Sequence, residues 1–299
     1  EELTVDDSLF LYHDVCTNGI GYVDLMFKTD SIAPEQIPYL GLLKSVLGYV
    51  DTENYTYGEL FNEINANTGG INCGVEVFDR ADSTEEFQAM FSVRGKALYT
   101  KIDFLFKMIG EILNSSKLED TKRLYEIVAS VKSRAQVNLT GAGHSTAVLR
   151  AAAYSSPMAA FQDEMAGIGY YQFIEKLEKD FEQRKEETVE ELCKLMKEIL
   201  RPENFMISYT GERESLETVQ KLAGAVKAGL GTEPVEKSEE KLTCTKKNEG
   251  FKTSGQVQYV AQTGNFKKKG LEYTGALEIL KVILSYDYLW MNLRVKGGA

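Results

Sequence analysis

Histidine is the side chain that most often holds catalytic zinc, and this chain has only two histidines, His13 and His144. A zinc peptidase site uses an H-E-x-x-H or H-x-x-E-H sequence, because that spacing puts two imidazoles on one face of a helix. Neither histidine belongs to such a sequence, and the two are far apart along the chain. The sequence therefore predicts no metal ligand in this chain.

Thiol chemistry is the next possibility, since the chain has four cysteines, Cys16, Cys73, Cys193 and Cys244. They are widely scattered and form no C-x-x-C pair, which argues against both a zinc ribbon and a disulfide framework. We expect reduced, mostly buried thiols. The closeness of His13 to Cys16 suggests a Cys–His dyad, but no nearby pattern supplies an oxyanion site or an orienting acid, so we interpret both residues as structural.

The run Thr-Gly-Ala-Gly-His-Ser-Thr at residues 140–146 looks like a phosphate-binding loop. It lacks the lysine of a G-K-[ST] motif and does not follow a predicted strand, so we interpret it as an ordinary loop. His144 is next to Ser145, but no G-x-S-x-G sequence surrounds them, and we expect a helix-capping or core role for His144. We therefore predict no catalytic residue in this chain.

The remaining residues show the periods of an α+β fold. Apolar residues recur at helical spacing in 37–50, 57–67, from 96 to 200, and in 216–226. Alternating patterns predict strands at 19–27, 71–77, 87–93 and 205–210, with the second and third paired as an antiparallel hairpin. This order predicts helices packed on one mixed or antiparallel sheet.

A second segment follows a polar stretch rich in Glu, Lys, Thr and Gly. The apolar pattern then restarts with a predicted strand at 256–262 and a helix from 277 toward Trp290. We predict a domain over 1–235, a linker over 236–250, and the truncated beginning of a second, similar domain over 251–299. Because the sequence starts Glu1-Glu2 without Met, we expect it to be a fragment of a longer protein.

The formal charge of −11 and the pI near 5.0 disfavour nucleic acid or an anionic membrane as the partner, since both need clustered Lys and Arg. A cationic peptide is favoured instead. No apolar run approaches the roughly 18 to 20 residues of a membrane span, and the acidic start does not look like a signal peptide. We expect a cytoplasmic protein, with an organelle matrix as the other compartment.

Six segments resemble the insulinase/pitrilysin family of zinc metallopeptidases, most closely its presequence-protease and falcilysin-like branch. They occur in the family's order along nearly the whole chain: residues 17–25, 37–40, 68–71, 143–144 with 149–152, 286–290 and 293–299. The resemblance implies four related α+β domains in two halves, of which this chain is the third domain and the start of the fourth. In the zinc-bearing domain of that family, the helix corresponding to 37–50 holds the ligands. Here it contains neither His nor Glu.

The resemblance further implies a division of labour. Zinc would be bound by the N-terminal half, which is the expected partner together with a peptide substrate, and Leu40, Leu43 and Leu47 would pack where ligands would otherwise lie. In the fourth domain of the family an Arg followed by a Tyr binds the substrate backbone. The matching Arg is Arg294, and the Tyr would lie beyond Ala299.

The function that follows is the non-catalytic C-terminal half of a zinc metalloendopeptidase that degrades short unstructured peptides in a closing chamber. By itself this chain is expected to be inactive. An alternative is a scaffold or partner subunit derived from a catalytically dead family member. A third alternative, an unrelated α+β hydrolase, would need a pocket lined by several acidic side chains. Gly297-Gly298 fits either a helix stop or a close approach of peptide to backbone.

Overall fold

The computed structural model describes residues 1–80, 82–238, 240, 242–253 and 257–298. The chain separates into two compact units, Glu1–Gln262 and Thr263–Ala299. The division into 1–235, 236–250 and 251–299 as parts of a larger peptidase stays a prediction. None of the helices in the described part of the chain combines the length and the apolar character needed to cross a lipid bilayer.

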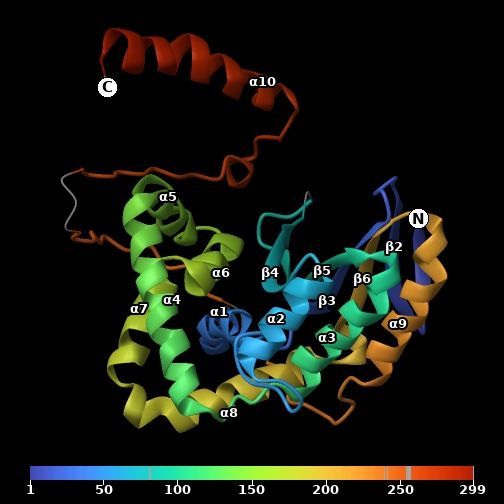
Figure 1. The fold of residues 1–299 in the computed structure, drawn as a ribbon. Coiled ribbons are helices and arrows are strands. Elements are labelled where there is room, and N and C mark those ends of the chain that lie inside the picture. The colour runs from blue at the N-terminus through green and yellow to red at the C-terminus, as the bar shows by residue number, and fades with distance from the viewer. Residues whose placement is uncertain (81, 239, 241, 254–256, 299) are drawn as a thin grey trace. The chain divides into compact units, whose positions relative to one another are not determined.

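The first unit is built on one sheet in the order β1-β2-β6-β3-β5-β4 (Figure 1). Neighbouring strands are antiparallel, except that β2 and β6 run parallel, so the predicted mixed or antiparallel sheet is confirmed as mixed. The strands are β1 Glu2–Val5, β2 Ser8–Asp14, β3 Ile20–Lys28, β4 Ile71–Asp79, β5 Phe87–Leu98 and β6 Phe205–Gly211.

The strands predicted at 19–27, 71–77, 87–93 and 205–210 are confirmed as β3, β4, β5 and β6, and so is the hairpin of β4 with β5. The sequence analysis missed β1 and β2. They are joined by the two left-handed residues Asp6 and Asp7, and β2 pairs with β6, which is almost 200 residues further along. Strand β1 alternates polar and apolar residues but has only four of them, and the partner of β2 is too distant in sequence to be seen in a local pattern.

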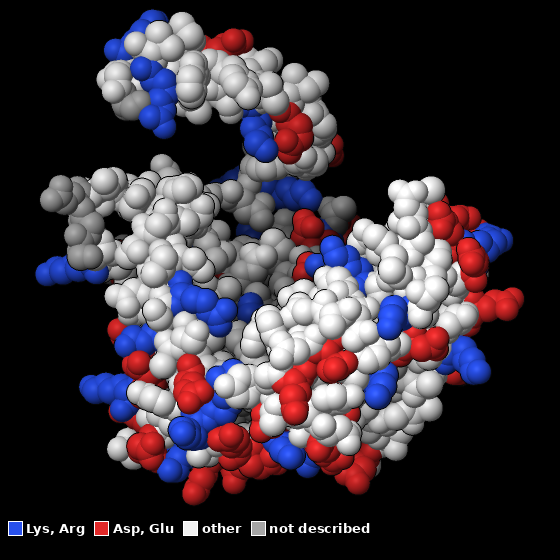
Figure 2. All heavy atoms as spheres, in the orientation of Figure 1, with Lys and Arg blue, Asp and Glu red and all other residues white. Residues whose placement is uncertain are grey.

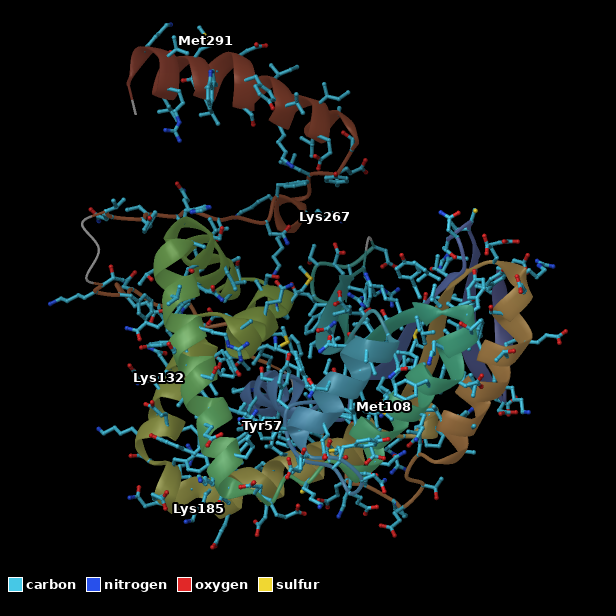
Figure 3. The ribbon with its side chains drawn as sticks, in the orientation of Figure 1. Tyr57, Met108, Lys132, Lys185, Lys267 and Met291 are labelled. Carbon is cyan, nitrogen blue, oxygen red and sulfur yellow. The ribbon has the colours of Figure 1, made fainter. Side chains whose placement is uncertain are left out.

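Helices α3 and α9 cover one face of the sheet (Figure 1). This face holds Leu25, Phe91 and Ile207, which are at most 1% exposed. Gly95 of β5 lets α3 approach closely, because an added Cβ would lie 2.5 Å from Cδ1 of Leu105. Met108 of α3 is also fully buried (Figure 3).

The helices of the first unit follow the predicted periods closely. The prediction for 57–67 matches α2 at both ends. Thr56 and Glu59 form a capping box at the start of this helix. The helices are α1 Ile37–Val46, α2 Tyr57–Asn67, α3 Ile102–Ser115, α4 Thr121–Gly141, α5 Gly143–Ala153, α6 Pro157–Ala166, α7 Ile168–Lys179, α8 Phe181–Ile199 and α9 Leu216–Ala228.

Helix α1 occupies the centre of this unit. It contacts β4 on one side and α4, α6, α7 and α8 on the other, and eight of its ten residues are buried. The helix ends at Val46, four residues earlier than predicted, and Gly48 then turns the chain at a φ of +85°. Such a central helix is apolar on all sides because it has almost no solvent face.

The surface of the first unit mixes both charges. Figure 2 shows Asp and Glu side chains interspersed with Lys and Arg over the side where α8 lies. Ion pairs of this kind include Lys132 with Glu178 at 2.7 Å and Lys185 with Glu182 at 3.0 Å. The visible face therefore has no continuous basic patch of the kind that binds nucleic acid.

The second unit is mainly one helical segment. It comprises α10 Ala276–Ile283 and a π-helix over Leu284–Lys296, so the helix predicted from 277 is confirmed. The strand predicted at 256–262 is wrong for residues 257–262, which have no strand partner among the described residues, and Gln256 lies outside the described residues. An alternating pattern makes a strand only where another edge supplies hydrogen bonds.

Candidate functional site

Helix α1 corresponds to the helix that holds the zinc ligands in the family that the sequence resembles, but it contains no His, Cys, Asp or Glu. Leu40, Leu43 and Leu47 are 0%, 1% and 2% exposed and belong to the central apolar core, as predicted. The described residues contain no group of three or more His, Cys, Asp or Glu side chains placed to hold a metal ion. The residues present therefore do not fit a zinc ion, and α1 is a packing element.

The two histidines lie on separate elements. His13 is on β2 and His144 is in the first turn of α5, and both side chains are exposed. The ring of His144 lies 6.4 Å from that of Tyr259, measured between centroids. A core role for His144 is therefore wrong, and the N-cap of α5 is Ala142 and not His144.

The run at 140–146 is helical and not the ordinary loop that we predicted. Thr140 and Gly141 end α4, Ala142 alone breaks the helix, and α5 starts at Gly143. Glycine is common where a helix ends, so a short run that contains glycines can join two helices directly.

Cys16, Cys73 and Cys193 are free thiols. Cys73 is enclosed by its surroundings, and this burial raises the pKa of its thiol to about 12. Cys16 is exposed, which contradicts the expectation of burial for that residue, and its thiol faces Asn18 Oδ1 at 3.9 Å. A thiolate nucleophile is therefore disfavoured at Cys73, and among the described hydrogen bonds none joins Cys16 to His13.

A buried ion-pair network lies at the junction of α5, α6 and α7. Arg150 Nη1 lies 2.5 Å from Asp163 Oδ2, and Arg150 Nε lies 2.6 Å from Glu249 Oε1. Asp163 also accepts hydrogen bonds from the backbone N–H groups of Ile168 at 3.0 Å and Gly169 at 3.2 Å. It therefore caps α7 while it neutralises Arg150.

Burial opposes the charge of Arg150, but hydrogen bonds to Glu249 and Asp163 outweigh it and hold the pKa of Arg150 above its usual value. Every member of the network has a partner, which indicates a structural role. Arg150 belongs to the run 149–152 that carried part of the family resemblance, but sequence analysis did not find Asp163 as its partner. The two acidic residues Asp163 and Glu164 shortly before Gly167 were the available signal, because the start of the next helix needs an acceptor.

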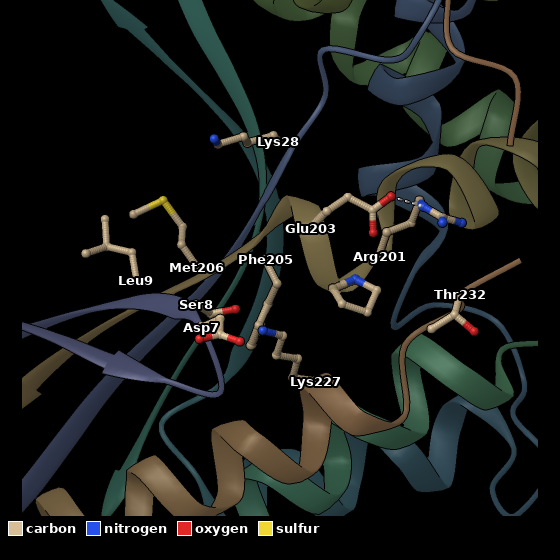
Figure 4. A pocket seen from close by; sticks show the side chains of 11 residues that line it. Asp7, Ser8, Leu9, Lys28, Arg201, Glu203, Phe205, Met206, Lys227 and Thr232 are labelled. Carbon is tan, nitrogen blue, oxygen red and sulfur yellow. Dashed lines mark hydrogen bonds and ion pairs between the residues drawn. The ribbon is translucent and has the colours of Figure 1, made fainter. Parts of the chain in front are cut away.

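A surface groove of about 550 Å³ lies at one end of the sheet. Figure 4 shows its lining side chains, which come from the β1–β2 turn, β3, the start of β6 and the end of α9. Two of its charged groups pair with each other, since Arg201 Nε lies 2.6 Å from Glu203 Oε1, and a third, Lys227, donates to the backbone carbonyl of Asp6. It holds neither His nor Cys, and its acidic residues, Asp7 and Glu203, do not form the several-carboxylate pocket that a dispersed hydrolase site would need.

Arg294 is in the last turn of the π-helix in the second unit, and it is exposed. Its backbone carbonyl accepts a hydrogen bond from the N–H of Gly298 at 3.2 Å, and Gly298 has a φ of +66°. An added Cβ at Gly297 would lie 2.6 Å from the carbonyl oxygen of Leu293. These contacts support the helix-stop interpretation of Gly297-Gly298.

The same helical segment exposes many large apolar side chains. They include Tyr286, Leu289, Trp290 and Leu293, which are 67%, 45%, 55% and 56% exposed. A surface of this kind is typical of a segment that packs against further protein.

Comparison with known proteins identifies the family to which this chain belongs. Residues 1–177 match the family described as "Peptidase M16C associated". The chain belongs to this family, and it corresponds to the C-terminal region of insulinase-family presequence proteases, as predicted.

Among its relatives, Protein HypA of Clostridium perfringens is 37% identical over the whole chain, which covers 30% of that protein. Presequence protease 1, chloroplastic/mitochondrial, of Arabidopsis thaliana is 27% identical over 97% of the chain and 27% of its own length. The chain thus spans less than a third of these relatives.

Solved structures support the fold. The peptidase M16 inactive domain from Pseudomonas fluorescens is similar with a TM-score of 0.52 and 14% identity, over 81% of this chain and 53% of that one. A conserved protein from Enterococcus faecalis V583 gives a TM-score of 0.55 and 13% identity, over 76% of this chain and 51% of that one. The α+β fold with helices packed on one sheet is therefore the fold of M16 domains.

Proposed function

We propose that this chain is the non-catalytic part of a zinc metalloendopeptidase that degrades short unstructured peptides in a closing chamber. The observation that carries this proposal is α1. In an M16 domain it is the helix that follows the opening strands, and here it is filled with buried leucines. A domain that keeps this fold without ligands contributes shape and binding, and the zinc belongs to an N-terminal half of the same polypeptide.

The proposed contribution to substrate binding is Arg294. A guanidinium offers several donors in a fixed plane, and it stays charged at any physiological pH. Directed at a substrate carbonyl oxygen, it would stabilise the negative charge that develops there in the transition state of peptide hydrolysis. Its exposed place at the end of a helix leaves it accessible to an extended peptide backbone.

The test uses the full-length protein that contains this chain, with a quenched fluorescent peptide as substrate. Arg294→Ala should lower kcat/KM at least about tenfold, the scale of losing one oxyanion donor. Lys296→Ala removes a cation two residues away and should leave kcat/KM nearly unchanged. Equal activity of the two variants would remove the proposed role of Arg294.

The isolated chain provides a second readout. It should show no chelator-sensitive cleavage of the same peptide at any zinc concentration, because its described residues hold no metal site. Zinc-dependent cleavage by the isolated chain would overturn the assignment of zinc to the other half.

A scaffold or partner subunit is the second candidate, and the exposed apolar side chains of the segment Leu284–Lys296 favour it. The two candidates differ in the full-length protein. A peptidase contains an H-x-x-E-H sequence and about one equivalent of zinc, whereas a dead scaffold contains neither. The cytoplasm or an organelle matrix is the compartment we propose, and the name of the plant relative assigns that protein to chloroplasts and mitochondria.

A further inference from the structure

The sheet of the first unit ends at β4, which pairs with β5 on one side only (Figure 1). An edge strand presents backbone N–H and C=O groups without a strand partner, and these groups can accept a further strand. Strand β1 at the opposite edge has only four residues, whereas β4 has nine residues in continuous register with β5. The edge of β4 is therefore the longer free edge of this sheet.

The hydrogen bonds of β5 show which residues of β4 face the free edge. The carbonyl of Ala89 accepts a hydrogen bond at 3.2 Å from the N–H of Thr29, which directly follows β3. The carbonyl of Lys96 accepts one at 2.7 Å from the N–H of Gly69, on the β4 side. Successive residues of a strand point their backbone groups to opposite sides. Odd-numbered residues of β5 therefore bond to β3, and even-numbered residues bond to β4.

Odd-numbered residues of β4 lie opposite odd-numbered residues of β5, so their backbone groups point away from β5. These residues are Ile71, Cys73, Val75 and Val77. Helices α1 and α6 contact β4, but within the described residues no backbone group of any element bonds to the N–H or C=O of these four residues. The four residues form a ladder of donors and acceptors that an added strand could pair with.

The side chains of the same four residues are apolar and only half-buried. They pack against the central core on the face of the sheet that holds Phe91 and Val93, their neighbours on β5. Phe91 and Val93 are at most 1% exposed, because β5 has a strand on both sides. Apolar side chains of an added strand would cover the half-buried row, and this burial would add to the backbone hydrogen bonds.

We propose that the β4 edge binds an extended peptide as a seventh, antiparallel strand of the sheet. A ladder of N–H and C=O groups on every second residue is complementary to another extended backbone, so the ladder itself identifies the class of ligand. In antiparallel pairing, each peptide residue opposite the ladder exchanges two hydrogen bonds with it and puts its side chain on the apolar row. The peptide therefore has apolar residues at alternate positions. The net charge of −11 favours basic residues at its ends.

This inference goes beyond the proposed function. The site belongs to the first unit, needs no zinc and does not involve Arg294, so binding is measured on this chain without any peptide cleavage. A failure to bind here leaves the proposed role in hydrolysis untouched, and loss of that role leaves this site untouched.

Fluorescence anisotropy with the whole chain tests the binding. The probe is a fluorescein-labelled peptide, Lys-Val-Thr-Val-Thr-Val-Thr-Val-Lys, whose valines match the apolar residues of the edge. N-methylation of the valines removes the N–H groups that would point at β4, whereas N-methylation of the threonines removes those that would point away. The valine-methylated peptide should bind at least about tenfold more weakly than the threonine-methylated one. Equal binding of the two, or no binding of the unmodified peptide at about 1 mM chain, overturns the proposal.

Two proline variants locate the site. Val75→Pro removes an N–H that points to the free edge and keeps the bonds between β4 and β5, since proline is tolerated where the N–H of an edge strand faces solvent. Thr4→Pro is the matched control at the opposite edge. There the terminal amine of Glu1 donates to the carbonyl of Tyr12 at 2.7 Å and the N–H of Tyr12 donates back at 2.8 Å, so Glu1 faces β2 and Thr4 faces away.

Val75→Pro should weaken binding of the unmodified peptide at least about tenfold, and Thr4→Pro should leave it unchanged, with both variants keeping the circular dichroism of the wild type. Unchanged binding in a folded Val75→Pro refutes the assignment to β4. If Val75→Pro unfolds, the two methylated peptides decide the question on the wild type. A second copy of the chain is the other candidate occupant: dimers that disappear in Val75→Pro, without any peptide binding, would overturn the proposal.

Discussion

Replacing Asp163 by alanine should destabilise the first unit more than any loss of a surface ion pair. Asp163 is 1% exposed, pairs with Arg150 and accepts two backbone hydrogen bonds at the start of α7. Asp163→Ala leaves the buried guanidinium with Glu249 alone and leaves the N–H groups of Ile168 and Gly169 without their acceptor. Removing one partner of a buried ion pair costs about 3–5 kcal/mol.

This free energy corresponds to a measurable change in melting temperature. For a unit of this size, 1 kcal/mol lowers the melting temperature by about 2–4 °C, so the expected decrease is about 6–20 °C. Urea unfolding followed by circular dichroism should show a lower midpoint with the same slope. Asp163→Asn keeps one oxygen for the helix start but loses the charge, and it should give an intermediate loss.

Two comparisons make the test specific. In the double variant Arg150→Met/Asp163→Ala no unpaired guanidinium is left, so it should be less destabilised than the sum of the single variants. Arg80→Met removes a solvent-exposed pair with Asp82 and should not shift the midpoint measurably. If Asp163→Ala lies within about 1 kcal/mol of the wild type, the argument from buried charge is wrong.

Two further predictions concern the core around α1. Burial raises the pKa of Glu198, so its pKa in the folded protein is above its pKa in the unfolded chain. The stability that protonation of Glu198 provides is therefore complete below the unfolded pKa, and it is lost as the pH rises through the folded pKa. Glu198→Gln should therefore raise the urea midpoint at pH 7 and give no gain below about pH 4, and an equal gain at both pH values would contradict this. Gly41→Ala should destabilise by about 1–3 kcal/mol, because its Cβ would lie 2.5 Å from the carbonyl oxygen of Met165. At Gly110 on α3 the nearest atom to an added Cβ is Asn114 Nδ2 at 4.0 Å, so Gly110→Ala should instead stabilise by about 0.5–1 kcal/mol. Thermal unfolding of both variants tests this, and a shift of the melting temperature in the same direction for both would contradict it.

The local periods predicted most of the helices and strands because each depends on neighbours in sequence. Helix α2 begins and ends at the predicted residues, and the capping box of Thr56 with Glu59 that stabilises its start is formed by residues adjacent in sequence. The antiparallel pairing of β4 with β5 was found for the same reason, because only a short turn separates them. Where the signal was local but ambiguous, as in residues 140–146, the interpretation was wrong, since glycines at a helix end and in a loop look alike.

The sequence by itself determined that this chain lacks both the H-E-x-x-H and the H-x-x-E-H sequences of zinc peptidases. Two isolated histidines exclude the zinc-binding pattern, and the leucines of residues 37–50 predict a buried helix in place of a ligand helix. Those conclusions depend on residue identity and spacing, which folding does not change.

Only the tertiary structure decided which distant residues meet. Asp163 and Arg150 are 13 residues apart on different helices, Glu249 comes from almost 100 residues further on, and β2 pairs with β6 across the whole unit. A hydrogen bond or an unpaired charge belongs to a place in three dimensions, and no local sequence pattern encodes that place.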